Sequence, residues 1–217
     1  MDATEAMFSV VIATRNRPAS FRAALESVLD QTFGEIEVIV VNDGSAEDHL
    51  PAYRALEQEA GGRVRFLNLQ PRPSGHGQSY ARNFGVSWAR SRYVCFLDDD
   101  DVWTDHRYLE CARDVIQHSE QPVDLHLANQ AAFLGECRRE GPVWIEGLAE
   151  ILRTERRQTD TQGAYAVTVD DLLKCTGFCH LNTTIVRRAL FDEIAVWNFN
   201  SVGYAMIRKD AIDRAAS

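Results

Sequence analysis

The feature that most constrains the fold is an apolar run at residues 93–97 that leads directly into four consecutive aspartates, residues 98–101. A short apolar run bounded by polar residues is typical of a buried strand in a parallel sheet. The aspartates would then stand at the carboxyl end of that strand, where open α/β sheets bind their ligands. The sequence therefore predicts an α/β protein with an acidic site at this edge of the sheet.

Two interpretations of the four aspartates compete. Adjacent carboxylates repel one another, and a divalent cation such as Mg²⁺ removes the repulsion while it also binds substrate phosphates. The alternative is a solvated acidic turn that caps the next helix, because aspartate favours turns and helix starts. The buried strand just before the aspartates favours the metal site.

Strands and helices alternate four times with short links. Strands are expected over residues 8–13, 37–41, 64–69 and 93–97, and helices over 18–31, 47–60, 78–90 and 104–118. This order predicts a mostly parallel sheet with helices on both faces. Polar clusters follow the first, second and fourth strands, at residues 14–17, 42–45 and 98–101, so we expect them to converge on one crevice.

The second half of the chain is less regular. We expect a strand within residues 123–133, a helix start at Thr168 followed by acidic residues, a strand over 182–186 and a helix over 188–194. We interpret residues 1–121 as the nucleotide-binding half and residues 122–217 as the half of the same domain that binds the second substrate.

Composition narrows the class of protein. The 217 residues suit one domain, and the net charge of −9 argues against a nucleic-acid partner. No apolar run approaches the roughly 20 residues that span a bilayer, and the acidic N-terminus does not resemble a signal peptide. We therefore expect a cytoplasmic protein, and this expectation includes a location at the inner face of the membrane.

The cysteines and histidines give no strong prediction. Five irregularly spaced cysteines suit reduced thiols. Cys175, Cys179 and His180 are close enough to suggest zinc, but no second ligand pair is apparent. His76 and His180 adjoin candidate site loops, and we interpret both as surface or internally bonded histidines.

Five ordered segments resemble one family. Residues 8–18, 25–33, 37–45, 81–85 and 96–103 look like the family 2 glycosyltransferases of the GT-A fold. The resemblance implies an inverting transferase that depends on Mg²⁺ or Mn²⁺. The donor would be a nucleotide sugar, most often a UDP-sugar, and the acceptor a carbohydrate or a lipid-linked hydroxyl, as in polysaccharide biosynthesis.

The resemblance implies roles for the residues after the first two strands. Asp43 matches the aspartate that hydrogen-bonds the nucleobase. Ala13, Thr14 and Arg15 match the loop that lies against the nucleoside. This chain departs from the pattern at Asn42, where a second aspartate is common, and at Arg15, where a tyrosine often stacks on the base. A guanidinium could stack there instead.

The resemblance also implies roles around the acidic segment. Arg82 matches an arginine that approaches the nucleotide. Asp98 and Asp99 match positions near the ribose and the sugar, and Asp100 matches the aspartate that binds the metal ion.

The catalytic base is less well marked. The family's Glu-Asp pair is not recognisable after residue 194, and Asp210 and Asp213 lie in the region where the family places its base. We name Asp210 as the candidate. The competing explanation is that this sequence lacks a segment there.

Two other functions fit part of the pattern. A sugar nucleotidyltransferase would also use a metal ion and a parallel sheet, but it should carry a glycine-rich loop after the first strand, and residues 14–18 contain no glycine. A non-catalytic nucleotide-sugar-binding protein is favoured only if the chain has no base. Neither a P-loop motif nor a G-x-S-x-G motif is present.

Overall fold

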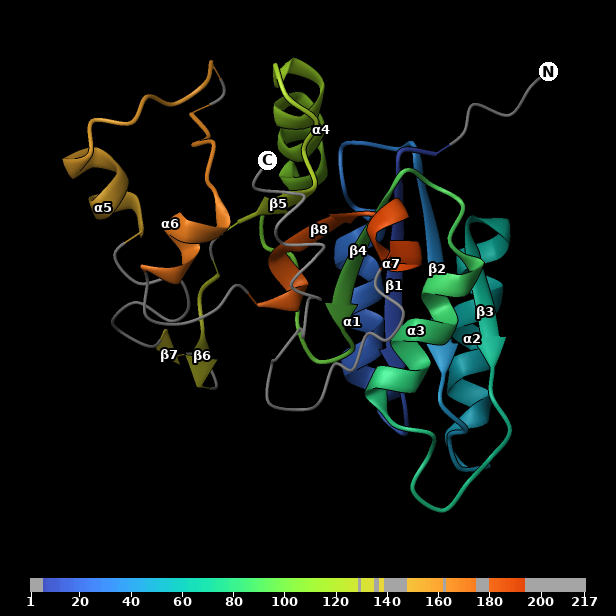
Figure 1. Cartoon of the computed structure of the whole chain (residues 1–217). Helices are drawn as coiled ribbons and strands as arrows, with labels where there is room; N and C mark the ends of the chain where they lie inside the picture. Colours follow the sequence, from blue (N-terminus) through green and yellow to red (C-terminus); the bar gives the residue numbers. More distant parts are fainter. Residues whose placement is uncertain are drawn as a thin grey trace.

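The computed structural model describes residues 6–128, 130–134, 137–138, 148–161, 163–174 and 180–193. Within these residues a six-stranded sheet has the order β3-β2-β1-β4-β8-β5 (Figure 1). Four of its strands run parallel, namely β1 (Phe8–Thr14), β2 (Ile36–Asn42), β3 (Val64–Asn68) and β4 (Tyr93–Asp98). The mostly parallel sheet that the sequence predicts is confirmed.

Helices cover both faces of the sheet because alternate strand residues point to opposite sides. On one face, Val10 and Ile12 pack with α1 (Pro18–Leu29), α2 (Leu50–Ala60) and α4 (Tyr108–His118). On the other face, Val11 and Ala13 pack with α3 (Gln78–Trp88), and α7 (Ala189–Glu193) adds Phe191. The parallel strands are therefore buried on both sides, which explains their continuous apolar sequence.

Two helices begin later than the sequence suggests. The helix expected from residue 47 starts at Leu50, after a turn in which the backbone N–H of His49 bonds to Ala46. The helix expected from residue 104 starts at Tyr108, because the Asp105 carboxylate accepts a bond from the backbone N–H of Arg107 and closes a turn instead. Local side-chain bonds of this kind compete with the first turn of a helix.

The second half of the chain extends the sheet with two antiparallel strands. β8 (Thr184–Arg187) pairs with β4 on one side and with β5 (Leu125–Leu127) on the other. A 3₁₀ turn, η2 (Leu181–Thr183), leads into β8. The strand expected within residues 123–133 is thus shorter than predicted, because β5 is an edge strand that ends after three residues.

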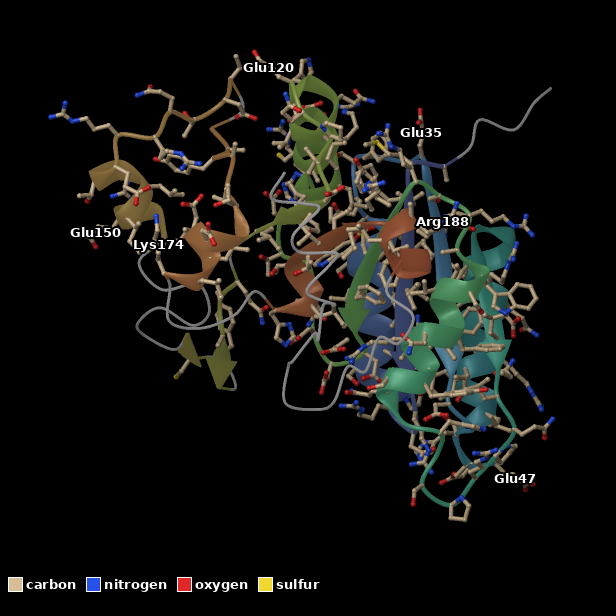
Figure 2. All side chains as sticks on the ribbon, viewed as in Figure 1. Glu35, Glu47, Glu120, Glu150, Lys174 and Arg188 are labelled. Carbon is tan, nitrogen blue, oxygen red and sulfur yellow. The ribbon has the colours of Figure 1, made fainter. Side chains whose placement is uncertain are left out.

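The remaining elements are short and lie beside the sheet. They are η1 (Gly61–Arg63), the hairpin β6 (Phe133–Leu134) and β7 (Cys137–Arg138), α5 (Leu148–Thr154) and α6 (Val169–Leu173). Thr168 caps α6, as the sequence predicts, and it forms a capping box with Asp171. Charged side chains such as Glu35, Glu47 and Glu120 are exposed at the periphery (Figure 2). No helix in the described ranges is long and apolar enough to cross a membrane.

Candidate functional site

The carboxyl ends of three strands meet at one edge of the sheet. The strand register aligns Thr14 with Asn42 and Ala13 with Asp98. The loop after β1 then bonds to both neighbouring loops, because the backbone N–H of Asn16 donates to Ser45 Oγ at 2.9 Å and that of Arg15 donates to Asp99 Oδ2 at 3.4 Å. The predicted convergence of the three polar clusters is confirmed.

Asp43 is buried where β2 ends, and it holds the loop that precedes α3. Its carboxylate accepts hydrogen bonds from the backbone N–H groups of His76, at 2.8 Å, and Gly77, at 2.9 Å, while His76 Nδ1 lies 2.9 Å from Oδ1. Gly75 has φ of +69°, and a Cβ there would lie 2.5 Å from Asp43 Oδ2. The close approach and the positive φ together require glycine at this position.

Arg15 lies against the same loop. Its Nη2 donates to the carbonyl oxygens of Arg72, at 3.3 Å, and Pro73, at 3.0 Å. Its Nε–H is buried and has no hydrogen-bond partner within the described part of the chain. Arg15 Nε and Asp43 Oδ2 both flank Gly75, so an open donor stands near a carboxylate acceptor.

Every carboxylate of the acidic segment has a different surrounding. Asp98 pairs with Arg82, which is buried on α3. Arg17 bridges the next two, because its Nη2 lies 2.8 Å from Asp99 Oδ1 and its Nη1 lies 2.5 Å from Asp100 Oδ2. Asp99 is fully buried, whereas 53% of the Asp100 side chain is exposed.

Asp101 is held from the second half of the chain. Asn182, which is buried in η2, donates from Nδ2 to Asp101 and accepts from the backbone N–H of Asp98 at 2.9 Å. Trp103 Nε1 donates to the Asn182 carbonyl at 2.8 Å. Our sequence reasoning did not identify Asn182 as a site residue. Its position as the first, polar residue of the strand expected over 182–186 was the available signal.

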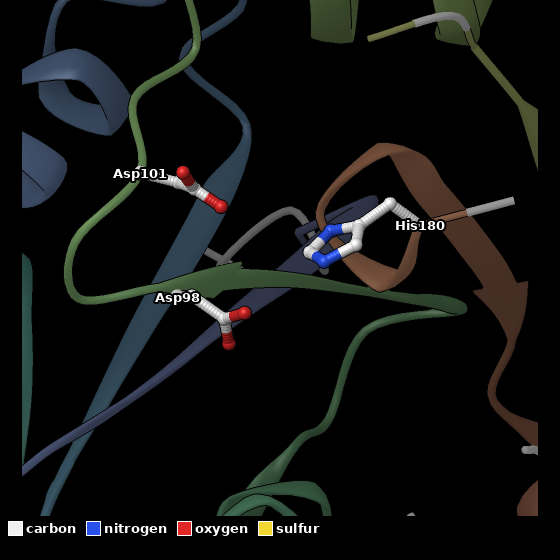
Figure 3. A group of neighbouring side chains, drawn as sticks. All are labelled: Asp98, Asp101 and His180. Atoms are coloured by element: carbon white, nitrogen blue, oxygen red, sulfur yellow. The ribbon is translucent and has the colours of Figure 1, made fainter. Parts of the chain in front are cut away.

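The second half also brings a histidine to the acidic segment. One ligand atom each from Asp98, Asp101 and His180 lies within 4.8 Å of the others, and all three residues are half-buried (Figure 3). The His180 imidazole faces the two carboxylates. We expected His180 to adjoin a site loop as a surface or internally bonded histidine, and the structure places it at the acidic segment itself. Two carboxylates and an imidazole suit a divalent ion such as Mn²⁺.

Asp100, which the resemblance marks as the metal ligand, is not part of this group of three. It points to Arg17 instead. The candidate base Asp210 and the cysteines Cys175 and Cys179 lie outside the described residues.

Burial, together with crowding of charge, raises the pKa values of two aspartates. Burial raises the pKa of Asp101, and the carboxylates of Asp98 and Asp100 raise it further, against smaller opposing effects of His180 and Asn182. Burial also raises the pKa of Asp99, although a hydrogen bond from Thr14 and the charge of Arg17 partly offset this. A bound cation would relieve the repulsion, so these residues fit a divalent metal ion.

Comparison with known proteins gives the family. The model of the family described as "Glycosyl transferase family 2" matches residues 9–195. This chain belongs to that family. An uncharacterized glycosyltransferase of Nostoc sp. is 29% identical over 148 residues, which are 66% of this chain and 44% of that protein. A PGL/p-HBAD biosynthesis glycosyltransferase of Mycobacterium bovis is 29% identical over 192 residues, 88% of this chain and 63% of the relative. The chain thus spans less than two thirds of either relative.

Solved structures support the fold of this family 2 member. S. aureus TarS, residues 1–349, superposes with a TM-score of 0.61 at 22% identity, over 86% of this chain and 48% of that one. Its complex with UDP-GlcNAc gives 0.58 at 21% identity, over 96% and 53%. A Pyrobaculum calidifontis mannosyltransferase in complex with GDP-Man and Mn²⁺ gives 0.55 at 17% identity, over 86% and 46%.

Replacing Asp101 by asparagine should stabilise the metal-free protein near neutral pH. The pKa of Asp101 is higher in the folded chain than in the unfolded chain, so the folded state binds more protons between the ordinary and the raised value. The stability that Asp101 contributes therefore falls as pH rises through that window. Urea unfolding from about pH 4 to pH 7 should show that the free energy of unfolding of Asp101→Asn, relative to that of the native chain, increases with pH. Exposed Asp30→Asn is the control, and a gain that does not vary with pH would contradict the raised pKa.

Proposed function

We propose that this protein transfers a sugar from a nucleotide-sugar donor to an acceptor hydroxyl with inversion at the anomeric carbon. The donor that we propose is a UDP-sugar. The observation that carries the proposal is the meeting of Asp43, Arg15 and the acidic segment at one sheet edge in a family 2 chain. The family match argues against the sugar nucleotidyltransferase considered above. The donor, the metal dependence and the inversion are parts of the proposal.

The polar groups around Gly75 complement the edge of uracil. Uracil offers an N–H at N3 between two carbonyl oxygens, and Asp43 is a buried acceptor beside the buried donor Arg15 Nε. A free carboxylate has about four lone-pair sites. The bonds from His76 and Gly77 occupy most of these sites, so we expect the loop to adjust when a base binds. Ala13 and Thr14 would line the nucleoside from β1.

The acidic segment would hold the rest of the donor. We propose that Asp98 and Asp99 face the ribose and the sugar, with Arg82 beside them, and that Asp100 binds Mg²⁺ or Mn²⁺. The proximity of Asp101 and His180 supports a metal ion at this end of β4. Such an ion would act as a Lewis acid toward the diphosphate leaving group.

Asp43→Ala should weaken UDP binding by roughly 5- to 150-fold, because a lost partner for a buried polar group costs about 1–3 kcal/mol. Calorimetry with UDP and CDP in Mn²⁺ separates recognition of the base from support of the loop. Cytosine has no proton at N3, so the native chain should prefer UDP, and Asp43→Ala should narrow that preference. The control is Asp48→Ala, whose side chain is 78% exposed. An equal loss for UDP and CDP would limit Asp43 to holding the loop.

Two variants test the metal ligands. Asp100→Ala should abolish the Mn²⁺ dependence of UDP binding, and His180→Ala should weaken Mn²⁺ binding by about tenfold or more, as expected when one of few ligands is lost. Asp105→Ala, an exposed aspartate beyond the segment, should change neither quantity. Unchanged Mn²⁺ dependence in Asp100→Ala would contradict the role that the family pattern gives this residue.

The inverting reaction needs a base within hydrogen-bond reach of the acceptor hydroxyl. We propose Asp210 for this role, because the four aspartates of the acidic segment are engaged on the donor side. Asp210→Asn should lower sugar transfer at least about 100-fold while UDP binding stays near normal. Asp213→Asn, three residues further along the chain, is the matched control. Full activity of Asp210→Asn would exclude Asp210 as the base.

A native chain that binds UDP but neither transfers nor hydrolyses any donor would instead favour the alternative of a non-catalytic nucleotide-sugar-binding protein.

A further inference from the structure

Arg17 is a cation that already pairs with the acidic segment, as Arg82 does at Asp98. Its guanidinium contacts Asp99 at 2.8 Å and Asp100 at 2.5 Å, so one side chain compensates two adjacent carboxylates. Arg17 therefore acts on the same group of charges that a divalent ion would neutralise.

The backbone of Arg17 is fixed, whereas its side chain is partly free. Its N–H donates to Tyr53 Oη at 3.1 Å, and its carbonyl accepts the N–H of Phe21 at 3.0 Å where α1 begins. Asn16, just before it, has φ of +56° and is held by a bond from the backbone N–H of Ala46 at 2.8 Å. The side chain of Arg17, by contrast, is 44% exposed. A long, partly solvated side chain on a fixed anchor can change partner without moving the loop.

The two partners of Arg17 differ in how firmly they hold it. Asp99 is fully buried, so its ion pair with the guanidinium is less screened by water. Asp100 is half-exposed, so its ion pair is screened by water and is easily exchanged. A guanidinium binds phosphate oxygens with the same forked geometry that it uses for carboxylates. Phosphate oxygens brought next to Asp100 would therefore be suitable new partners.

We propose that Arg17 is an internal counter-ion that competes with the divalent cation in the free protein and moves to the diphosphate when the donor binds. This inference rests on the proposed function: the first step uses its metal site at Asp100, and the second step also uses its nucleotide-sugar donor. In the free protein, Arg17 compensates Asp99 and Asp100 and weakens binding of a metal ion alone. With the donor present, the metal ion takes Asp100 and Arg17 contacts the phosphate oxygens. The site would thus favour the metal and the diphosphate together over the metal alone.

Arg17→Gln tests both steps and predicts effects of opposite sign. Mn²⁺ binding without nucleotide, measured by the EPR signal of free Mn²⁺, should become about 2- to 10-fold tighter, since a competing charge is removed. UDP binding in saturating Mn²⁺, measured by calorimetry, should become at least about fivefold weaker, because a charged hydrogen bond to phosphate is lost. A residue that only supported the fold would weaken both.

Two further variants complete the test. Arg17→Lys keeps the positive charge but loses the forked guanidinium. Mn²⁺ alone should therefore bind as in the native chain, while UDP should bind more weakly. The control is Arg22→Gln, since Arg22 lies on α1, the helix that begins just after Arg17, is also 44% exposed and pairs with Glu26 and Glu59. It should change neither affinity.

The outcomes separate this inference from the proposed function. If Arg17→Gln does not tighten binding of Mn²⁺ alone, Arg17 is not a competing counter-ion. If the native chain and Arg17→Gln bind UDP equally well in Mn²⁺, the transfer of Arg17 to the diphosphate is wrong while the proposed function stands. If neither chain binds Mn²⁺ or UDP, both proposals fail.

Discussion

The arrangement of the site depends on one electrostatic constraint, which is that four adjacent carboxylates follow a strand buried on both faces. Such a cluster is unfavourable unless each charge is solvated, paired or protonated. The structure uses partners from three separate parts of the chain. Arg17 comes from the loop after β1, Arg82 from α3 and Asn182 from η2. Compensation of these charges therefore ties the loops around the sheet edge together.

This constraint gives β8 a role beyond closing the sheet. The antiparallel pairing of β8 with β4 brings η2 next to the end of the acidic strand. Asn182 then bonds to both ends of the four-residue turn, to the backbone of Asp98 and to the side chain of Asp101. The same segment carries His180. The second half of the chain thus completes a site whose other residues all come from the first half.

The side of the site near Asp43 is built on different physics. Here a single buried carboxylate is satisfied mostly by backbone N–H groups of the loop before α3. Backbone donors fix the carboxylate without adding a competing charge, so Asp43 differs from the aspartates at the end of β4. Arg15 closes this side by bonding to the carbonyl oxygens of Arg72 and Pro73. The site therefore combines a wall held by backbone hydrogen bonds with a strongly charged edge.

The sequence by itself determined the parallel core and the edge at which the site lies. Buried parallel strands must be continuously apolar, and polar residues directly after them can only lie at the carboxyl ends, so residues 8–13, 37–41 and 93–97 were readable locally. Helix starts were less readable, because Asp105 bonds to its own neighbours and delays α4.

Only the tertiary structure decided which partner each aspartate receives. Asn182 and His180 lie about 80 residues from the acidic segment along the chain, and no local pattern encodes a contact at that separation. It exists because β8 pairs with β4, and pairing of strands depends on the packing of the whole sheet. The same reason explains why Asp100 faces Arg17 while Asp101 faces His180: the turn after β4, fixed by the bonds to Asn182, sets the direction of each side chain.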